Sequence, residues 1–229
     1  MKVDIYSDIA CPWCYIGKAR FERALAAFPG ADEVTVTFRP FQLDPTTPDA
    51  SVPLYEYTDR KFGPGFRDKH AQVSQIAKGE GLEFRMDKTR AVNTFTAHRL
   101  LWLAGQEYGR DVQTTLKNTL LAGYFTEGAD VGRPEDLVAL AQRAGLDQAR
   151  VAEFLAGDDG TAEVREELEH ARALGVSAVP TFVFEDKYAV QGAQEASVFL
   201  QVLERVAQET APSPVPGGGG DCADGACAV

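Results

Sequence analysis

The sequence predicts an α/β fold, and the first forty residues carry the clearest signals for it. Residues 3–9 are rich in strand-forming side chains and predict a strand that ends at Cys11. A helix is expected from Pro12, because its fixed φ and missing amide hydrogen suit the first helical position. Residues 34–38 alternate β-branched and aromatic side chains, which predicts a second strand.

The middle of the chain, from about residue 54 to residue 174, has a helical period instead. Apolar residues recur every three to four positions between glycine-rich breaks, which predicts about five to seven helices. Strand character returns at residues 181–184 and 188–191, and the polar pair between them predicts a hairpin. An apolar stripe over residues 198–206 predicts a last helix. The helical block is therefore expected to pack against β/α segments on both sides.

The composition excludes several classes of protein. Of the 229 residues, 45% are hydrophobic and 25% are charged, so the chain can bury a core and is not globally disordered. A formal net charge of -11 repels a phosphate backbone, so we expect no nucleic-acid partner. Asp4 and Asp8 interrupt the segment where a secretory signal needs an apolar run, and the sequence lacks a run of about 18 apolar residues. We therefore expect a cytoplasmic protein without a membrane partner.

Two of the four cysteines form the motif Cys11-Pro12-Trp13-Cys14 at the predicted start of the first helix. As the N-cap, Cys11 would lie at the positive end of the helix dipole, which predicts a lowered pKa and an attacking thiolate. Cys14 would lie one turn further on, within disulfide distance of Cys11 and less accessible to reagents. The alternative interpretation is half of a zinc site, which needs two more ligands. Only the tail cysteines supply a pattern for them.

Charged side chains elsewhere could act on this thiolate. Lys18, Arg20 and Arg39 are candidates to stabilise it, and His98 is the histidine that could face the site, although a structural role is favoured for it. The sequence does not show which way these side chains point.

Several segments together resemble the DsbA-like branch of the thioredoxin superfamily and, within it, the cytosolic FrnE-type proteins. The matching segments span about residues 2–207 and are Ile5-Tyr-Ser-Asp-Ile-Ala-Cys-Pro-Trp-Cys-Tyr-Ile-Gly17, Arg39-Pro-Phe-Gln-Leu43, Asn93-Thr-Phe-Thr-Ala-His-Arg-Leu100, Gly175-Val-Ser-Ala-Val-Pro-Thr-Phe-Val183 and Val190-Gln-Gly-Ala-Gln194. The resemblance implies a thioredoxin fold, β-α-β followed by β-β-α, with a large all-helical insertion. Residues 1–50 and 175–209 would form the thioredoxin-like domain, residues 51–174 the insertion and residues 210–229 a flexible tail.

The resemblance also implies a function. The chain would be a thiol-disulfide oxidoreductase or isomerase that exchanges disulfides with protein thiols or small thiols through Cys11 and Cys14. Pro180 is implied to be cis and to lie against this pair, and Val179, Pro12 and Trp13 are implied to contact the substrate. No cofactor or metal is expected, while glutathione as a co-substrate and a homodimer are both left open.

Two alternatives differ in chemistry. The glutathione-dependent kappa-class transferases and hydroxychromene carboxylate isomerases resemble the chain over the same architecture, but they typically carry Ser where Cys11 stands. Both cysteines are present here, which favours dithiol exchange over an isomerase or transferase. The second alternative is a binding module in which all four cysteines hold one zinc ion.

The tail contains the other two cysteines. Cys222 and Cys227 flank Asp224-Gly225, a turn signal that could bring the two sulfur atoms to bonding distance. A proline- and glycine-rich linker of about a dozen residues could let the pair reach Cys11. We expect an auxiliary redox pair that relays electrons to Cys11 and Cys14, with a metal-binding or inert tail as the alternatives.

Overall fold

A four-stranded mixed sheet forms the centre of the computed structural model, which describes residues 1–210. The strand order is β2-β1-β5-β6, with β1 parallel to β2 and antiparallel to β5, and β5 antiparallel to β6. The strands are β1 (Lys2–Ser7), β2 (Thr35–Pro40), β5 (Thr181–Phe184) and β6 (Tyr188–Gln191). The two predicted N-terminal strands and the predicted hairpin are thus confirmed. The tail cysteines Cys222 and Cys227 lie outside the described residues.

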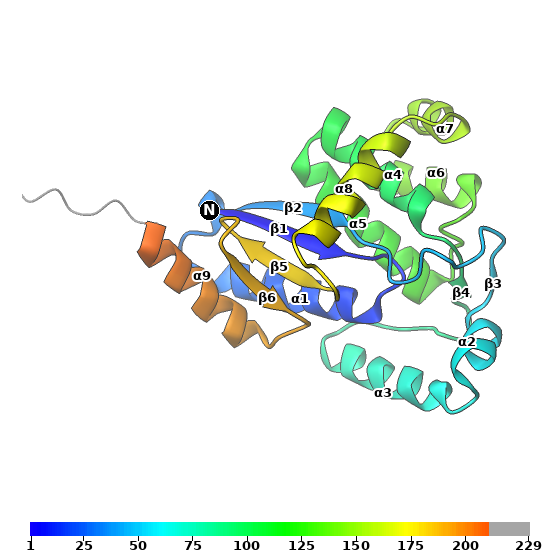
Figure 1. Cartoon of the computed structure of the whole chain (residues 1–229), viewed down its shortest axis with the longest axis horizontal. Coiled ribbons are helices and arrows are strands. Elements are labelled where there is room, and N and C mark those ends of the chain that lie inside the picture. Colours follow the sequence, from blue (N-terminus) through cyan, green and yellow to red (C-terminus); the bar gives the residue numbers. More distant parts are fainter. Residues whose placement is uncertain (211–229) are drawn as a thin grey trace, which may run out of the picture.

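Two helices from opposite ends of the chain pack together beside the sheet (Figure 1). They are α1 (Pro12–Ala27) and α9 (Ala196–Thr210). Their shared core is aromatic, with the Phe182 ring 5.3 Å from that of Phe21 and 4.5 Å from that of Phe199. Burial of such large rings away from water is the main force that holds these layers together.

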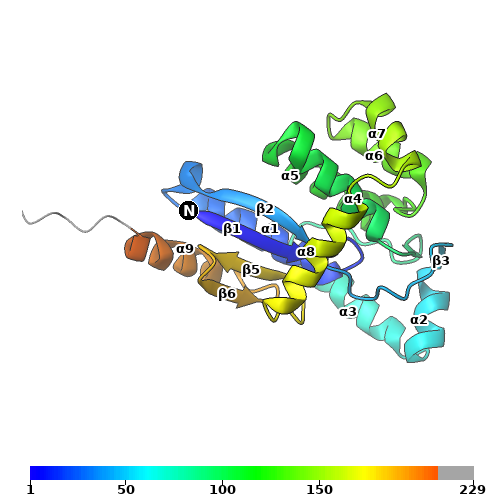
Figure 2. The ribbon, with the colours of Figure 1, turned by 45° about the horizontal axis from the view of Figure 1, so that its top comes forward.

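The helical block lies between β2 and β5 in the sequence and to one side of the sheet in space (Figures 1 and 2). Its seven α-helices in the described residues are α2 (Leu54–Phe62), α3 (Phe66–Gly79), α4 (Phe95–Leu103), α5 (Arg110–Ala122), α6 (Pro134–Arg143), α7 (Gln148–Ala156) and α8 (Thr161–Ala173). A two-stranded sheet of β3 (Val52–Pro53) and β4 (Arg90–Ala91), which we did not predict, joins the segment before α2 to the segment before α4. The α4 and α5 helices continue into single π-helical turns at Ala104–Tyr108 and Gly123–Glu127.

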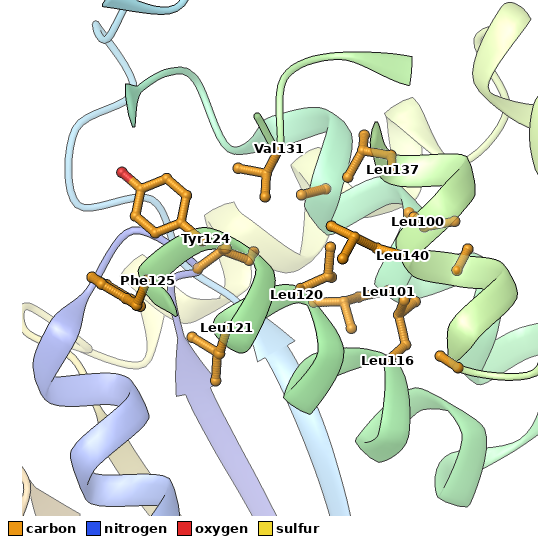
Figure 3. Packing of buried hydrophobic residues seen from close by; sticks show 14 of the residues in the cluster. Leu100, Leu101, Leu116, Leu120, Leu121, Tyr124, Phe125, Val131, Leu137 and Leu140 are labelled. Carbon is orange, nitrogen blue, oxygen red and sulfur yellow. The ribbon is translucent and has the colours of Figure 1, made fainter. Parts of the chain in front are cut away.

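A second apolar core fills the helical block (Figure 3). It includes Leu100, Leu101, Leu116, Leu120 and Leu140, all nearly inaccessible to solvent. Ile9 and Ile16, which flank the Cys-Pro-Trp-Cys motif, belong to the same cluster. The insertion is therefore packed directly against the start of α1, which places its side chains beside the motif.

This arrangement confirms the expected thioredoxin fold with a large helical insertion. The first strand ends at Ser7 instead of residue 9, because the chain turns at residues 9 and 10 while the Asp8 carboxylate contacts the Leu43 N–H and the His98 ring. Among the described residues, no helix has both the length and the apolar character that crossing a membrane requires.

Candidate active site

Cys11 is the N-cap of α1, as predicted. Its backbone is extended, with φ -92° and ψ 111°, and Pro12 follows at the first helical position. The Cys14 N–H donates to Cys11 Sγ at 3.3 Å and to the Cys11 carbonyl oxygen at 3.0 Å. The first turn of α1 thereby holds the two cysteines together. Both are free thiols, so this is the geometry of the dithiol form.

The loop before β5 lies against this turn. The Val179–Pro180 peptide bond is cis, as the resemblance implies. The Cys11 thiol donates to the Val179 carbonyl oxygen at 3.7 Å, so residues 168 positions apart meet at one sulfur atom. Gly17 allows the close approach, because a Cβ there would lie 2.9 Å from Pro180 Cγ. Cys11, Cys14, Val179 and Pro180 thus form one site.

The two sulfur atoms do not differ in exposure, contrary to our prediction. Cys11 is 2% exposed and Cys14 is 1% exposed. Both pack in a small cluster with Tyr6 of β1 and with Val176 and Val179 of the loop before β5. The sequence shows that a helix begins at Cys11, but not that the later loop closes over it. Of the residues implied to contact substrate, Trp13 is 41% exposed, Pro12 is half-buried and Val179 is buried.

The predicted low pKa of Cys11 is wrong for the dithiol form. Burial raises the pKa of the Cys11 thiol well above its usual range, and the Cys14 thiol and the Asp8 carboxylate act in the same direction. The Cys14 N–H opposes them but does not outweigh them. The prediction considered the helix N-terminus and could not include desolvation, which disfavours any buried thiolate.

The three cations that we considered near the thiols point elsewhere. Lys18 pairs with Glu22 one turn along α1. Arg20 donates to Glu80 at 2.6 Å and to the Ala193 carbonyl oxygen at 2.8 Å. Arg39 pairs with Asp4 at 3.1 Å. Within residues 1–210, therefore, these side chains are engaged by other carboxylates.

A buried polar pair lies directly before the motif. Asp8 Oδ2 accepts the Leu43 N–H at 2.8 Å, and Asp8 Oδ1 lies 3.3 Å from His98 Nε2. Burial raises the pKa of Asp8, but the bonds to His98 and to the Leu43 N–H outweigh this and hold it below its usual value. Burial lowers the pKa of His98 despite the Asp8 carboxylate, so its imidazole is neutral at pH 7. His98 therefore faces the site.

The segment that contains His98 has a structural purpose that the sequence did not reveal. Asn93 Nδ2 donates to the carbonyl oxygens of Pro45 and Thr47, at 3.3 and 3.2 Å, and thereby holds the proline-rich segment after β2. Arg99 donates to the carbonyl oxygen of Asp159 at 3.0 Å, which ties α4 to the turn before α8.

Lys117 of α5 is the charged residue near the thiols that sequence reasoning missed. It is 1% exposed, and the charges of Cys14, Asp8 and Cys11 raise its pKa while burial lowers it. A signal was present, because Gln113, Lys117 and Leu121 recur at four-residue spacing beside the apolar stripe of α5. That spacing places Lys117 next to a buried face but does not show what the face contacts. Residues 1–210 contain no group of three or more His, Cys, Asp or Glu side chains that could hold a metal ion.

Comparisons with known proteins agree with this geometry. The model of the DSBA-like thioredoxin domain matches residues 2–204. The chain belongs to this family. A probable DsbA oxidoreductase of Streptomyces coelicolor, SCO1869, has a similar crystal structure with a TM-score of 0.85 and 39% identity, over 94% of this chain and 93% of that one.

Two further proteins are more distant. The uncharacterized protein YwbO of Bacillus subtilis (strain 168) is 26% identical over 208 residues, which cover 88% of this chain and 94% of YwbO. The cytosolic disulfide reductase DsbM of Pseudomonas aeruginosa has a TM-score of 0.65 at 15% identity, over 91% of this chain and 100% of that one, and so shares the fold.

Proposed function

We propose that this protein is a thiol-disulfide oxidoreductase that exchanges disulfides through Cys11 and Cys14. One observation carries the proposal: two thiols lie within one helical turn, and the sulfur of the first contacts the carbonyl oxygen of Val179, the residue before cis-Pro180. An exposed Trp13 and Leu43, the latter bonded through its N–H to Asp8, offer apolar surface beside the thiols. Membership of the DSBA-like family supports the same chemistry.

The exchange balances as two thiol-disulfide displacements. In the oxidising direction a substrate thiolate attacks Cys11 Sγ, the Cys11–Cys14 bond breaks, and Cys14 leaves as a thiolate. A second substrate thiolate then attacks the substrate sulfur, forms the substrate disulfide and releases Cys11. In the reducing direction Cys11 attacks a substrate disulfide, and Cys14 attacks Cys11 to release the substrate thiol. The substrates proposed are protein thiols or disulfides and small thiols, with glutathione among them.

The test is reduction of insulin disulfides in the presence of dithiothreitol, together with single cysteine variants. We expect the wild-type protein to accelerate insulin reduction, and Cys11→Ser and Cys14→Ser each to abolish the acceleration. In addition, Cys14→Ser is expected to accumulate a mixed disulfide at Cys11, because the second displacement is blocked. The isomerase or transferase chemistry would be established instead if the wild-type protein did not reduce insulin, and if it and Cys14→Ser conjugated glutathione equally well.

The cysteine pair of the tail can be tested with the same Cys14→Ser variant. We propose that Cys222 and Cys227, which lie outside the described residues, exchange electrons with Cys11. The proposal rests on the linker length and on the turn signal between the two cysteines. Mass spectrometry of Cys14→Ser is expected to find a disulfide between Cys11 and a tail cysteine, and to lose it in Cys14→Ser/Cys222→Ser/Cys227→Ser. If Cys14→Ser lacked this disulfide and the tail bound zinc, the metal-ligand interpretation would be favoured.

A further inference from the structure

Arg20 of α1 connects three separate parts of the molecule. Its Nε donates to Glu80 Oε1 at 2.6 Å, and its Nη1 donates to the Ala193 carbonyl oxygen at 2.8 Å. Glu80 is the C-cap of α3 in the insertion, whereas Ala193 lies in the loop between β6 and α9. Only 12% of the Arg20 side chain is exposed. The arginine therefore links the insertion to that loop across α1.

Glu80 fixes the direction of the Arg20 side chain. The Glu80 side chain is 9% exposed, and its carboxylate accepts bonds from Arg20 and from Arg23, also in α1. Burial raises the pKa of Glu80, but the bonds from Arg23 and Arg20 outweigh this effect and hold the pKa below its usual value. The carboxylate is thus charged at neutral pH. A charged bond to a planar guanidinium has a defined direction, and here it leaves Nη1 of Arg20 for Ala193.

The loop between β6 and α9 in turn supports the loop that contains Val179 and Pro180. The Gly192 N–H donates to the Pro180 carbonyl oxygen at 2.7 Å. The next residue, Ala193, touches α1, because a Cβ on Gly17 would lie 3.2 Å from Ala193 Cα. Ala193 also packs against the apolar core of the insertion. A shift of Ala193 would therefore be transmitted to Pro180 through the adjacent Gly192.

The last contact in this series reaches Cys11. The Cys11 thiol donates to the carbonyl oxygen of Val179, the residue before Pro180, at 3.7 Å. Arg20 itself lies about 13 Å further along α1 than Cys11, given the rise of about 1.5 Å per residue in a helix. Any effect of Arg20 on the site must therefore pass through the two loops.

We propose that Arg20 is a positioning residue for the dithiol site. The proposal rests on the proposed function, in which a protein substrate meets Cys11 beside Val179. Arg20, oriented by Glu80, holds the loop between β6 and α9, and that loop holds Pro180 and with it Val179. The end of α3 in the insertion is thereby coupled to the surface that receives the substrate.

Arg23 separates this role from a contribution to stability alone. It bonds to the same Glu80 carboxylate, but its side chain is 50% exposed, and among residues 1–210 it makes no hydrogen bond to the loop between β6 and α9. A second carboxylate near Arg20, that of Glu195, lies 2.8 Å from Nη1 but is 66% exposed and contributes little. The bond to the Ala193 carbonyl oxygen is therefore what distinguishes Arg20 from Arg23.

The first test measures insulin reduction by the full-length protein over a range of insulin concentrations. We expect Arg20→Met to raise KM for insulin at least about fivefold and to keep kcat within about twofold, because the displaced loop weakens substrate binding and leaves both thiols in place. The matched control Arg23→Met is expected to keep both constants within about twofold. A loss of folded protein would instead lower kcat at constant KM.

An unchanged KM in Arg20→Met, or an equal rise of KM in Arg23→Met, would overturn the proposal.

The second test does not depend on catalysis. Hydrogen exchange of the Gly192 amide is followed by NMR in the full-length reduced protein. We expect Arg20→Met to accelerate exchange at Gly192 at least about tenfold, because the loop that carries this amide loses its anchor. The Ile5 amide in the central strand β1 is the internal control and should exchange within about twofold of its wild-type rate. Equal exchange at Gly192 in the two proteins would overturn the proposal.

Arg20→Lys covers the case in which Arg20→Met does not fold. Lysine keeps a positive charge beside Glu80 but lacks the planar fork that bonds Glu80 and Ala193 in two directions. We expect a higher KM for insulin and faster exchange at Gly192 in this variant, and wild-type values of both would then overturn the proposal. If the wild-type protein does not reduce insulin, the proposed function fails, and exchange at Gly192 still tests the link to Arg20.

Discussion

The cis-Pro180 loop and the helical insertion approach the dithiol from different sides and with different chemistry. The loop contributes apolar side chains and one carbonyl oxygen, that of Val179, which accepts from Cys11 Sγ. The insertion contributes His98 of α4, which contacts the Asp8 carboxylate, and the buried Lys117 of α5, whose Nζ lies 5.8 Å from the centre of the Phe38 ring. One side is close-packed and uncharged, whereas the other is buried but charged.

The two sides therefore act differently: the loop side fixes the position of groups around Cys11, and the insertion side shifts pKa values. On the loop side, the close approach of Pro180 to Gly17 fixes the loop against α1, where we propose that the substrate sulfur meets Cys11. Charged groups in a desolvated space shift the pKa values of their neighbours strongly, because water does not screen them. We therefore expect substitutions on the loop side to change stability and activity together, and those on the insertion side to change the pH dependence.

The largest expected effect is that of Asp8→Asn, which removes the carboxylate from the charged side. It should lower the free energy of unfolding at pH 7 by about 3 kcal/mol, because the Leu43 N–H and the neutral His98 ring lose a charged hydrogen-bond acceptor. The pKa of Asp8 is lowered in the folded state, so its contribution is complete above the ordinary aspartate pKa of about 3.9 and is lost as the pH falls through the lower folded value.

Urea unfolding of both proteins at several pH values measures this effect. The difference between wild type and Asp8→Asn should be full at pH 7 and shrink in strong acid. The exposed Asp32, which has no ion pair within the described residues, serves as the control, and Asp32→Asn is expected to have no comparable pH dependence. A constant difference at every pH would contradict the assignment of a charged Asp8.

A smaller effect is expected for Gly17→Ala on the apolar side. The added Cβ would lie 2.9 Å from Pro180 Cγ and 3.2 Å from Ala193 Cα, so the loop must move. Overpacking of this kind costs about 1–3 kcal/mol. We expect a lower midpoint in urea and a lower rate of insulin reduction.

The matched control for this substitution is Gly79→Ala at the end of α3, where nothing lies within 4 Å of the added atom. It should be neutral or slightly stabilising, because alanine favours a helix more than glycine does. Equal behaviour of Gly17→Ala and Gly79→Ala would show that the contact with Pro180 is not tight.

The smallest expected effect on stability is that of Trp13→Ala. The Trp13 side chain is 41% exposed, so its loss should change the free energy of unfolding by less than about 1 kcal/mol. We expect the rate of insulin reduction to fall several-fold. The rate at which the reduced protein reacts with DTNB, a small aromatic disulfide that releases a coloured thiolate, should stay within about twofold, because only the protein substrate is large enough to need that surface. A parallel fall of both rates would assign Trp13 to the dithiol itself.

Much of the fold could be predicted because its signals are local. Pro12 after Cys11 marks a helix start, and the polar pair Asp186-Lys187 between two apolar runs marks a hairpin; both occur in the structure. The two-residue strands β3 and β4 were missed because a period cannot be recognised in two residues. The cis-Pro180 loop was expected from the family resemblance, not from the residues around it.

The sequence by itself determined the helix that begins at Pro12, the two N-terminal strands, the hairpin and the last helix, because caps, prolines and apolar periods act over a few positions. Only the tertiary structure decided that Cys11 and Lys117 are buried and that Asp8 meets His98 across 90 positions. The physical reason is desolvation. A pKa depends on everything that displaces water from a group, and those atoms come from segments far apart in the chain.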